Sequence, residues 1–263
     1  GEQKELEAWA GEVKAAFNTK FLNPETGVYA TGSQTAMAMP LCVGLVDDSL
    51  RTKVLDNLVD SIRADGNVLT AGDIGFHYLV EALTEGGASQ LLFEMNNRDD
   101  VPGYGYQLKK GATTLTESWA ALKEVSNNHL MLGHLMEWFY QGLGGIRQSE
   151  SSTGYKDLII RPEVVGDLRF VRASFRSPYG EITTRWEKTD ELFTLQVEVP
   201  ANTKATVYLP FAGEVTVNNR KPDAASVPGL TGTEEEAGKT VCRVGSGSYI
   251  FRIKLQVQNR SQV

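Results

Sequence analysis

The chain has 263 residues, and 26 Lys and Arg against 33 Asp and Glu give it a formal net charge of −7. This length suits one large domain or two ordinary ones, and the composition, 41% hydrophobic and 22% charged, is that of a soluble globular protein. The acidic balance and the absence of a long Lys/Arg run argue against a nucleic-acid partner. The uncharged stretch over residues 30–46 carries polar residues and Pro40, so no membrane span is expected.

The compartment stays open between cytoplasmic and periplasmic or secreted. Residues 1–20 form a charged amphipathic segment without the apolar core of a secretory signal. Cys42 and Cys242 lie far apart in the sequence and form no CxxC motif, so they indicate neither a disulfide framework nor a metal or redox site.

Apolar residues recur at helical spacing from residue 2 to about residue 146, which predicts a series of helices. A second helix over 33–46 should be kinked or ended by Pro40. The segment 126–141 is apolar on nearly all sides, which predicts a buried helix. The other expected helices are marked by Leu6 to Phe17, by Leu50 to Ile62 with Asp48 and Ser49 as caps, by Tyr78 to Leu83 up to Gly86-Gly87, and by Ala88 to Met95.

After Gly144-Gly145 the pattern changes to period two, which predicts short strands separated by turns. The sequence therefore predicts an α-helical array over 1–147 and an antiparallel β-sandwich over 148–263. The stretch 222–239 is expected to be a long polar loop. The predicted strands are 158–161, 170–175, 181–186, 193–199, 205–209, 215–217, 241–244 and 249–255.

Two connections between helices carry the unusual side chains. The longer one, residues 96–118, exceeds the usual length of a connection in a compact domain, which indicates a functional loop or a missed element. Its Pro102-Gly103-Tyr104-Gly105-Tyr106 run is expected to be a turn whose aromatic faces suit a sugar ring, or alternatively cover a core edge. Glu117, beside Trp119, is the candidate for proton transfer, and the alternative is an N-terminal helix residue that interacts with the helix dipole.

The shorter connection, residues 70–77, contains Asp73 and His77. Asp73 is either a helix cap or a carboxylate that binds a hydroxyl, and His77 either contacts a ligand or is a core histidine. His129, beside Asn128 and expected one turn inside the last helix, has the same two interpretations. His129 and His134 are five residues apart and miss the i, i+4 spacing of metal-binding histidine pairs, so no metal is expected. No phosphate-binding loop or dinucleotide motif is present, and no cofactor is expected.

Taken together, these motifs resemble the bacterial α-L-rhamnosidases of glycoside hydrolase family 78. Gly111-Ala112-Thr113-Thr114-Leu115-Thr116-Glu117-Ser118-Trp119 is similar to that family's Gly-Ala-Thr-Thr-x-x-Glu-x-Trp signature. Asn128-His129 with Gly133 and Glu137-Trp138-Phe139-Tyr140 resembles a following segment, and Ser177-Pro178-Tyr179-Gly180 resembles the start of its C-terminal β domain. The matches stay in order from residue 34 to residue 180.

The resemblance implies an (α/α)6 barrel and an inverting glycosidase that cleaves terminal α-L-rhamnose, or a related sugar, from a polysaccharide or glycoside. It also implies that Glu117 is the general base, that His129 contacts the sugar, and that Tyr104 lines the pocket; Trp119, Asp73, His77 and Asn128 are the further candidates for substrate contacts. Where the family commonly has Trp-Glu-Arg-Trp-Asp-Gly, this chain has Thr116 to Ala121 without the Arg and the Asp, which removes two potential hydroxyl contacts.

Residues 1–116 contain nothing similar to the family's Arg- and Asp-rich motif that carries the general acid. The six or seven expected helices also amount to about half of a closed six-hairpin barrel. The chain is therefore expected to be the C-terminal half of an (α/α)6 toroid followed by a β-sandwich, which associates with itself or with the missing N-terminal half. The alternatives are a non-catalytic carbohydrate-binding or structural module, and another six-hairpin hydrolase or lyase.

Overall fold

The structure is a computed structural model, and it describes residues 1–255. The described residues form two compact units, which divide between Met136 and Glu137. Among the described residues, no helix is both long and apolar enough to cross a bilayer.

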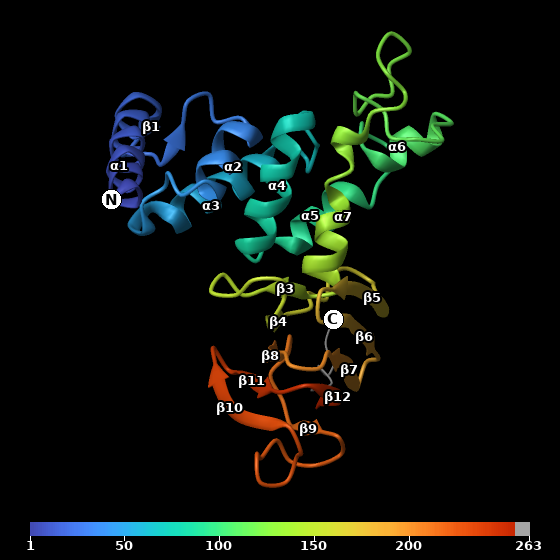
Figure 1. The fold of residues 1–263 in the computed structure, drawn as a ribbon. Coiled ribbons are helices and arrows are strands. Elements are labelled where there is room, and N and C mark those ends of the chain that lie inside the picture. Colours follow the sequence, from blue (N-terminus) through green and yellow to red (C-terminus); the bar gives the residue numbers. More distant parts are fainter. Residues whose placement is uncertain (256–263) are drawn as a thin grey trace, which may run out of the picture. The chain divides into compact units, whose positions relative to one another are not determined.

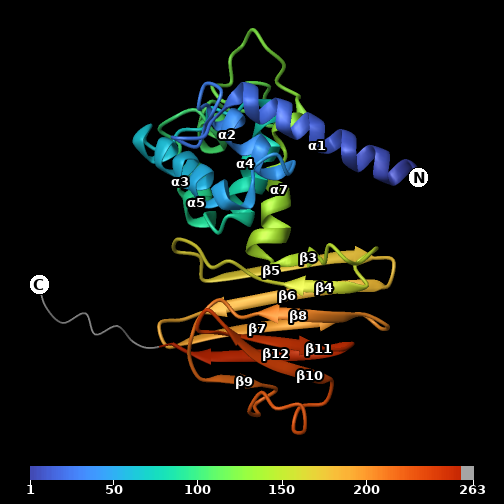
Figure 2. The ribbon, with the colours of Figure 1, turned by 90° about the vertical axis from the view of Figure 1, so that its left-hand side faces the viewer.

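The first unit is built from helices (Figure 1). Residues with the predicted spacing form α1, α2, α3, α4 and α5, and a two-stranded hairpin of β1 and β2 follows α1. The bounds are α1 (Glu2–Phe21), β1 (Leu22–Asn23), β2 (Val28–Tyr29), α2 (Gln34–Cys42), α3 (Asp48–Ala64), α4 (Asp73–Glu85) and α5 (Ser89–Asn96). Helix α1 projects away from the others in Figure 2, and none of its residues is buried.

The core of this unit lies where α2, α3 and α4 pack together. Val54, Leu58 and Ile62 recur every four residues on α3 and are fully buried, as the amphipathic pattern predicts. Pro40 lies inside α2, which ends two residues later. A Cβ atom on Gly75 would lie 1.9 Å from Oγ1 of Thr35, so glycine is required where α4 approaches α2.

Two predictions about the end of this region are wrong. The expected turn at residues 102–106 is instead the beginning of a short helix, α6 (Tyr104–Lys109). The expected continuous helix over 126–141 is broken into turns, a 3-10 turn η1 (Leu130–Leu132), α7 (Leu135–Trp138) and a π-helical turn η2 (Phe139–Leu143). The break occurs because residues 126–129 form backbone hydrogen bonds with residues 115–117 instead of with their own neighbours.

The second unit is a sandwich of two five-stranded sheets, which Figure 1 shows edge-on. One sheet has the order β10-β11-β8-β4-β3 and the other β5-β6-β7-β12-β9. All pairs are antiparallel except β4 with β8, which is parallel. The bounds are β3 (Ile146–Gln148), β4 (Asp157–Ile160), β5 (Phe170–Ser177), β6 (Gly180–Lys188), β7 (Leu192–Val199), β8 (Lys204–Tyr208), β9 (Val215–Val217), β10 (Leu230–Glu236), β11 (Lys239–Val244) and β12 (Gly247–Lys254).

Alternating side chains from both sheets form the core of the sandwich. Trp186 and Phe193 are fully buried there, and the Trp186 indole donates to the carbonyl oxygen of Leu143 over 2.8 Å. The expectation of a loop throughout 222–239 is wrong, because β10 occupies 230–236 and pairs with β11. Its Glu234-Glu235-Glu236 run carries no apolar alternation, so the strand is held by backbone pairing on an exposed edge.

Candidate functional site

Two segments of the first unit, residues 114–117 and 126–129, lie side by side and carry the family-like motif. The amide of Glu117 donates to the carbonyl oxygen of Ser126 over 2.9 Å, and the amide of His129 donates to Leu115 over 2.8 Å. The Thr114 hydroxyl also donates to the carbonyl oxygen of Asn127. These bonds bring Glu117, Asn128 and His129 into one irregular region.

Glu117 lies in this paired region and outside any helix, so its alternative role at a helix N-terminus is wrong. Its Oε2 accepts a hydrogen bond of 3.0 Å from the amide of Ser126, which orients the carboxylate. The side chain is exposed, and among residues 1–255 no donor reaches its Oε1. A carboxylate held by one oxygen and open at the other can accept a proton from water.

Trp119 anchors the motif to the helical core. It is 8% exposed, and its indole N–H donates to the carbonyl oxygen of Ala71 over 2.7 Å. The rings of Phe76 and Tyr104 meet it edge to face, with centroids 4.8 Å and 5.1 Å away. Phe76 was not among the candidates; it lies one turn along α4 from Asp73, a spacing that could have indicated it.

Tyr104 is half-buried, and its hydroxyl donates to the carbonyl oxygen of Leu132. Burial raises the pKa of this phenol well above its usual value because the charged phenolate is poorly solvated there. The hydroxyl therefore remains a neutral donor, and it ties α6 to the 3-10 turn η1.

This raised pKa predicts a pH dependence of stability. Unfolded tyrosine loses its proton near pH 10, at about its ordinary pKa, whereas folded Tyr104 keeps it to a higher pH. The stabilisation is fully present below the unfolded pKa and is lost as pH rises through the folded one. We expect Tyr104→Phe to flatten the fall of the unfolding free energy above about pH 10, measured by urea denaturation; parallel curves for the two proteins would contradict this.

The side chains of Asp73 and His129 come from different segments of the first unit and lie next to each other. Asp73 is the first residue of α4, its Oδ1 accepts from the amide of Ile74 over 2.9 Å, and Gly72 is the N-cap. Its Oδ2 lies 3.5 Å from Nε2 of His129. That Nε2 is buried and has no hydrogen-bond partner among the described residues. His129 precedes η1 in an extended conformation, so its expected place inside a helix is wrong.

His77 and Asn128 have neighbours other than the site candidates. His77, on α4, lies 3.7 Å from the carboxylate of Glu81 and places its ring 4.9 Å from that of His134. Asn128 is exposed beside His129, and its backbone N–H donates to the Ser126 hydroxyl over 3.2 Å. The structure thus brings Asp73 to His129, and Tyr104 to Trp119, while the roles of all seven candidates stay predictions.

Comparison with known proteins identifies both units. Residues 1–143 match the model of the bacterial alpha-L-rhamnosidase six-hairpin glycosidase domain, and residues 145–222 match that of the bacterial alpha-L-rhamnosidase C-terminal domain. An alpha-L-rhamnosidase of Streptomyces avermitilis is 31% identical over 92% of this chain and 23% of its own length. One of Formosa agariphila is 28% identical over 96% of this chain and 28% of its own length. The chain thus spans about a quarter of these relatives.

Solved structures of alpha-L-rhamnosidases have the same fold as this chain. The alpha-L-rhamnosidase of Dictyoglumus thermophilum superposes with a TM-score of 0.85 at 31% identity, over 96% of this chain and 29% of that one. The Streptomyces avermitilis enzyme, in complex with L-rhamnose, gives 0.82 at 31% identity, over 92% of this chain and 23% of that one. The helical unit and the sandwich therefore have the predicted fold class, a six-hairpin type of helical domain followed by a β-sandwich. Because the six-hairpin glycosidase model alone covers more than half of the sequence, the chain belongs to the bacterial α-L-rhamnosidase family of glycosidases.

Proposed function

We propose that this chain is the C-terminal part of an enzyme that removes terminal α-L-rhamnose from a glycoside or polysaccharide with inversion of configuration. Family membership supports the reaction class, and one relative was solved with L-rhamnose bound. The observation that carries the proposal is the Glu117 carboxylate, held at Oε2 by the Ser126 amide and open at Oε1. In an inverting glycosidase, such a carboxylate removes a proton from the water that attacks the anomeric carbon.

The surrounding side chains are suited to contact a sugar. Nε2 of His129 is buried without a hydrogen bond, which costs free energy unless a ligand supplies the partner. After a small rotation of the ring, a sugar hydroxyl would bind Nε2 together with Oδ2 of Asp73, 3.5 Å away. We assign His129, Asp73, Asn128 and His77 to hydroxyl contacts, and Tyr104 and Trp119 to the aromatic wall beside them.

The general acid is assigned to a segment outside this chain. Inversion needs a second carboxyl group about 6.5–9.5 Å from the base, across the sugar. The acidic motif of the family has no counterpart in residues 1–116, and the chain spans about a quarter of its relatives. We propose that residues 1–147 are the C-terminal half of the six-hairpin domain and that residues 148–263 are the β-sandwich domain; the two family-model matches, which meet at residues 143–145, support this division.

The preceding half of the six-hairpin domain is the proposed partner of α1. Leu6, Trp9 and Val13 are 54%, 64% and 50% exposed on this helix. An apolar hollow of about 290 Å³, lined by Phe17 and Met39 among others, lies between α1 and α2. Exposed apolar surface of this kind marks an interface.

For the isolated chain we therefore expect self-association through α1. Sedimentation velocity should show dimers or larger species at micromolar concentration, and Trp9→Lys should shift them to monomer by placing a charge in the apolar face. Leu108→Lys, on α6 at a residue 72% exposed, is the control that should leave association unchanged. A wild-type chain that sediments as a clean monomer would argue against the interface.

Hydrolysis of an aryl α-L-rhamnoside tests the proposed reaction. The longer protein should release aryl alcohol, and NMR of the first product should show the β-anomer of rhamnose, as inversion requires. The 263-residue chain alone should be inactive. Robust hydrolysis by this chain would contradict the missing acid, binding of sugar without turnover by the longer protein would favour a carbohydrate-binding module, and an unsaturated product absorbing in the ultraviolet would indicate a lyase.

A further inference from the structure

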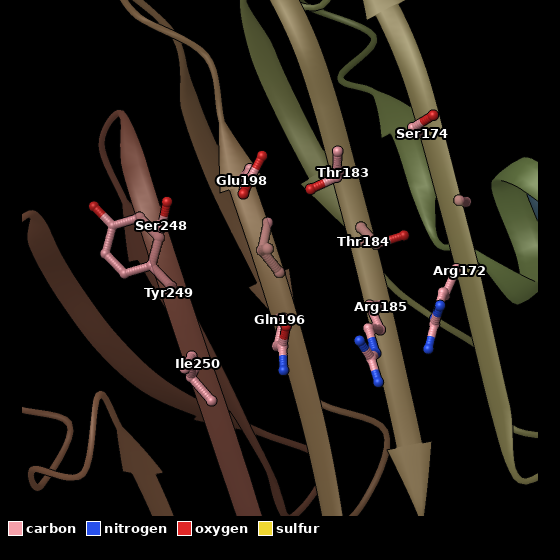
Figure 3. A pocket seen from close by; sticks show the side chains of 12 residues that line it. Arg172, Ser174, Thr183, Thr184, Arg185, Gln196, Glu198, Ser248, Tyr249 and Ile250 are labelled. Atoms are coloured by element: carbon pink, nitrogen blue, oxygen red, sulfur yellow. The ribbon is translucent and has the colours of Figure 1, made fainter.

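A groove on the outer face of the sheet β5-β6-β7-β12 has the chemistry of a second carbohydrate site. It has a volume of about 440 Å³ and is crossed by four adjacent strands (Figure 3). Because side chains alternate along a strand, the outward residues form rows across the sheet. Two of these rows differ in charge, and all of their members belong to the second unit.

The first row is positively charged. Arg172 of β5 pairs directly with Arg185 of β6, and Arg185 pairs with Gln196 of β7. Like charges directly opposite each other are unfavourable in a sheet. Arg185 donates from Nε to Oε1 of Glu187 over 3.1 Å, and this bond, with the charges of Arg185 and Arg172, lowers the pKa of Glu187. Within residues 1–255, no hydrogen bond or close ion pair engages Arg172, whose charge acts on Glu187 only at longer range, so two guanidinium groups share one carboxylate.

The second row is rich in hydroxyl groups and ends at a carboxylate. Ser174 pairs with Thr183, Thr183 with Glu198, and Glu198 with Ser248. In Figure 3, Ser174, Thr183 and Glu198 lie toward one end of the groove, while Arg172 and Arg185 lie toward the other. The rows are two residues apart along each strand, about 7 Å, a spacing comparable to that of neighbouring sugar units.

We propose that this groove binds an oligosaccharide in which a carboxylate-bearing sugar adjoins a neutral sugar, with the carboxylate at Arg172 and Arg185. Guanidinium groups bind carboxylates through paired, charge-assisted hydrogen bonds. The hydroxyls of the neutral sugar face Thr183 and Glu198, whose carboxylate accepts hydrogen bonds and disfavours a second acidic sugar at this end. All residues of this groove belong to the second unit, and it holds the oligosaccharide without reacting with it.

The test is a titration of the 263-residue chain with tetrasaccharides, followed by NMR or calorimetry. One probe alternates galacturonate with rhamnose, and the other alternates glucuronate with N-acetylglucosamine. The second probe contains no rhamnose, so its binding is independent of the proposed hydrolytic activity. We expect at least one probe to bind and its methyl ester to bind at least tenfold more weakly. Failure of both probes, or equal affinity of acid and ester, would overturn the proposal, as would tighter binding of a sulfated tetrasaccharide.

Variants locate the site. The double variant Arg172→Gln, Arg185→Gln should lose at least tenfold in affinity while its melting temperature changes little, because the removal of opposed like charges offsets the loss of the exposed bond between Arg185 and Glu187. The control Arg243→Gln changes an exposed arginine of β11 in the opposite sheet and should bind normally. Equal losses in the control and the double variant would contradict the assignment, because they would reflect net charge alone.

A further variant tests the polarity of the groove. Tetragalacturonate should bind the wild-type chain more weakly than the alternating probe, and Glu198→Gln should reduce this difference. If tetragalacturonate binds as tightly as the alternating probe in both proteins, the assignment of the neutral sugar to the Glu198 end is wrong.

Discussion

Replacement of Glu117 by Gln in the proposed longer enzyme should lower kcat by a factor of about 10² or more. The side-chain amide oxygen of Gln can still accept the hydrogen bond from the Ser126 amide, which the Glu117 carboxylate now accepts over 3.0 Å. The local fold should therefore persist, while the carboxylate that we propose as the general base is lost. KM should change little, because water activation contributes to the transition state and only weakly to substrate binding.

The measurement is steady-state hydrolysis of an aryl α-L-rhamnoside by wild type and variant, with circular dichroism and a thermal melt to verify folding. Glu124→Gln provides the control. Glu124 is an exposed carboxylate in the same segment, and its substitution changes the net charge by the same amount. The control should keep nearly full activity. Turnover of the Glu117 variant within a few-fold of wild type would exclude Glu117 as the general base.

The periodic spacing of apolar residues predicts the helices and strands that bury a single face. On α3 the apolar positions Val54, Leu58 and Ile62 repeat every four residues, and all three are buried as expected. The strands of the sandwich core alternate in the same readable way, for example Phe193, Leu195 and Val197 on β7. These patterns suffice because burial of a single face determines the orientation of each element.

The segment 126–141 shows where local patterns fail. Its apolar composition predicts a helix, yet the amide of His129 donates to Leu115 and that of Glu117 to Ser126. The backbone at Gly133 also lies close to the preceding turn, since a Cβ there would be 3.0 Å from the carbonyl oxygen of Leu130. Hydrogen bonds between distant segments leave no periodic signal in the sequence, so neither this pairing nor β10 could be predicted from composition.

In the candidate site, too, some features can be predicted from the sequence and others depend on tertiary packing. Glu117 and His129 were found by motif resemblance, and their neighbourhood comes from the pairing of residues 114–117 with residues 126–129. The approach of Asp73 to His129, 3.5 Å between Oδ2 and Nε2, joins residues far apart in the sequence. The packing of Phe76 on Trp119 is also tertiary. Most residues of the candidate site can be predicted from the sequence. The contacts between them cannot, because these contacts depend on how the helices pack.

Trp119 offers the largest expected effect on stability. In the isolated chain, Trp119→Ala should lower the free energy of unfolding of the helical unit by about 3–5 kcal/mol, because a buried aromatic side chain is replaced by a cavity. The indole is 8% exposed and meets the rings of Phe76 and Tyr104. The substitution also leaves the carbonyl oxygen of Ala71 without the donor that now reaches it over 2.7 Å.

Urea denaturation followed by circular dichroism should resolve this loss, at a protein concentration low enough for the chain to be monomeric. The matched control is Trp9→Ala, the same substitution at a side chain that is 64% exposed on α1. It removes little buried surface in the monomer and should change the unfolding free energy by no more than about 0.5 kcal/mol. Equal effects of the two substitutions would contradict the structural role of Trp119. A large loss at Trp119 alone would mean that the Glu117 motif is held in place by the aromatic cluster, so that substitutions in this cluster would impair catalysis indirectly, through the position of the carboxylate.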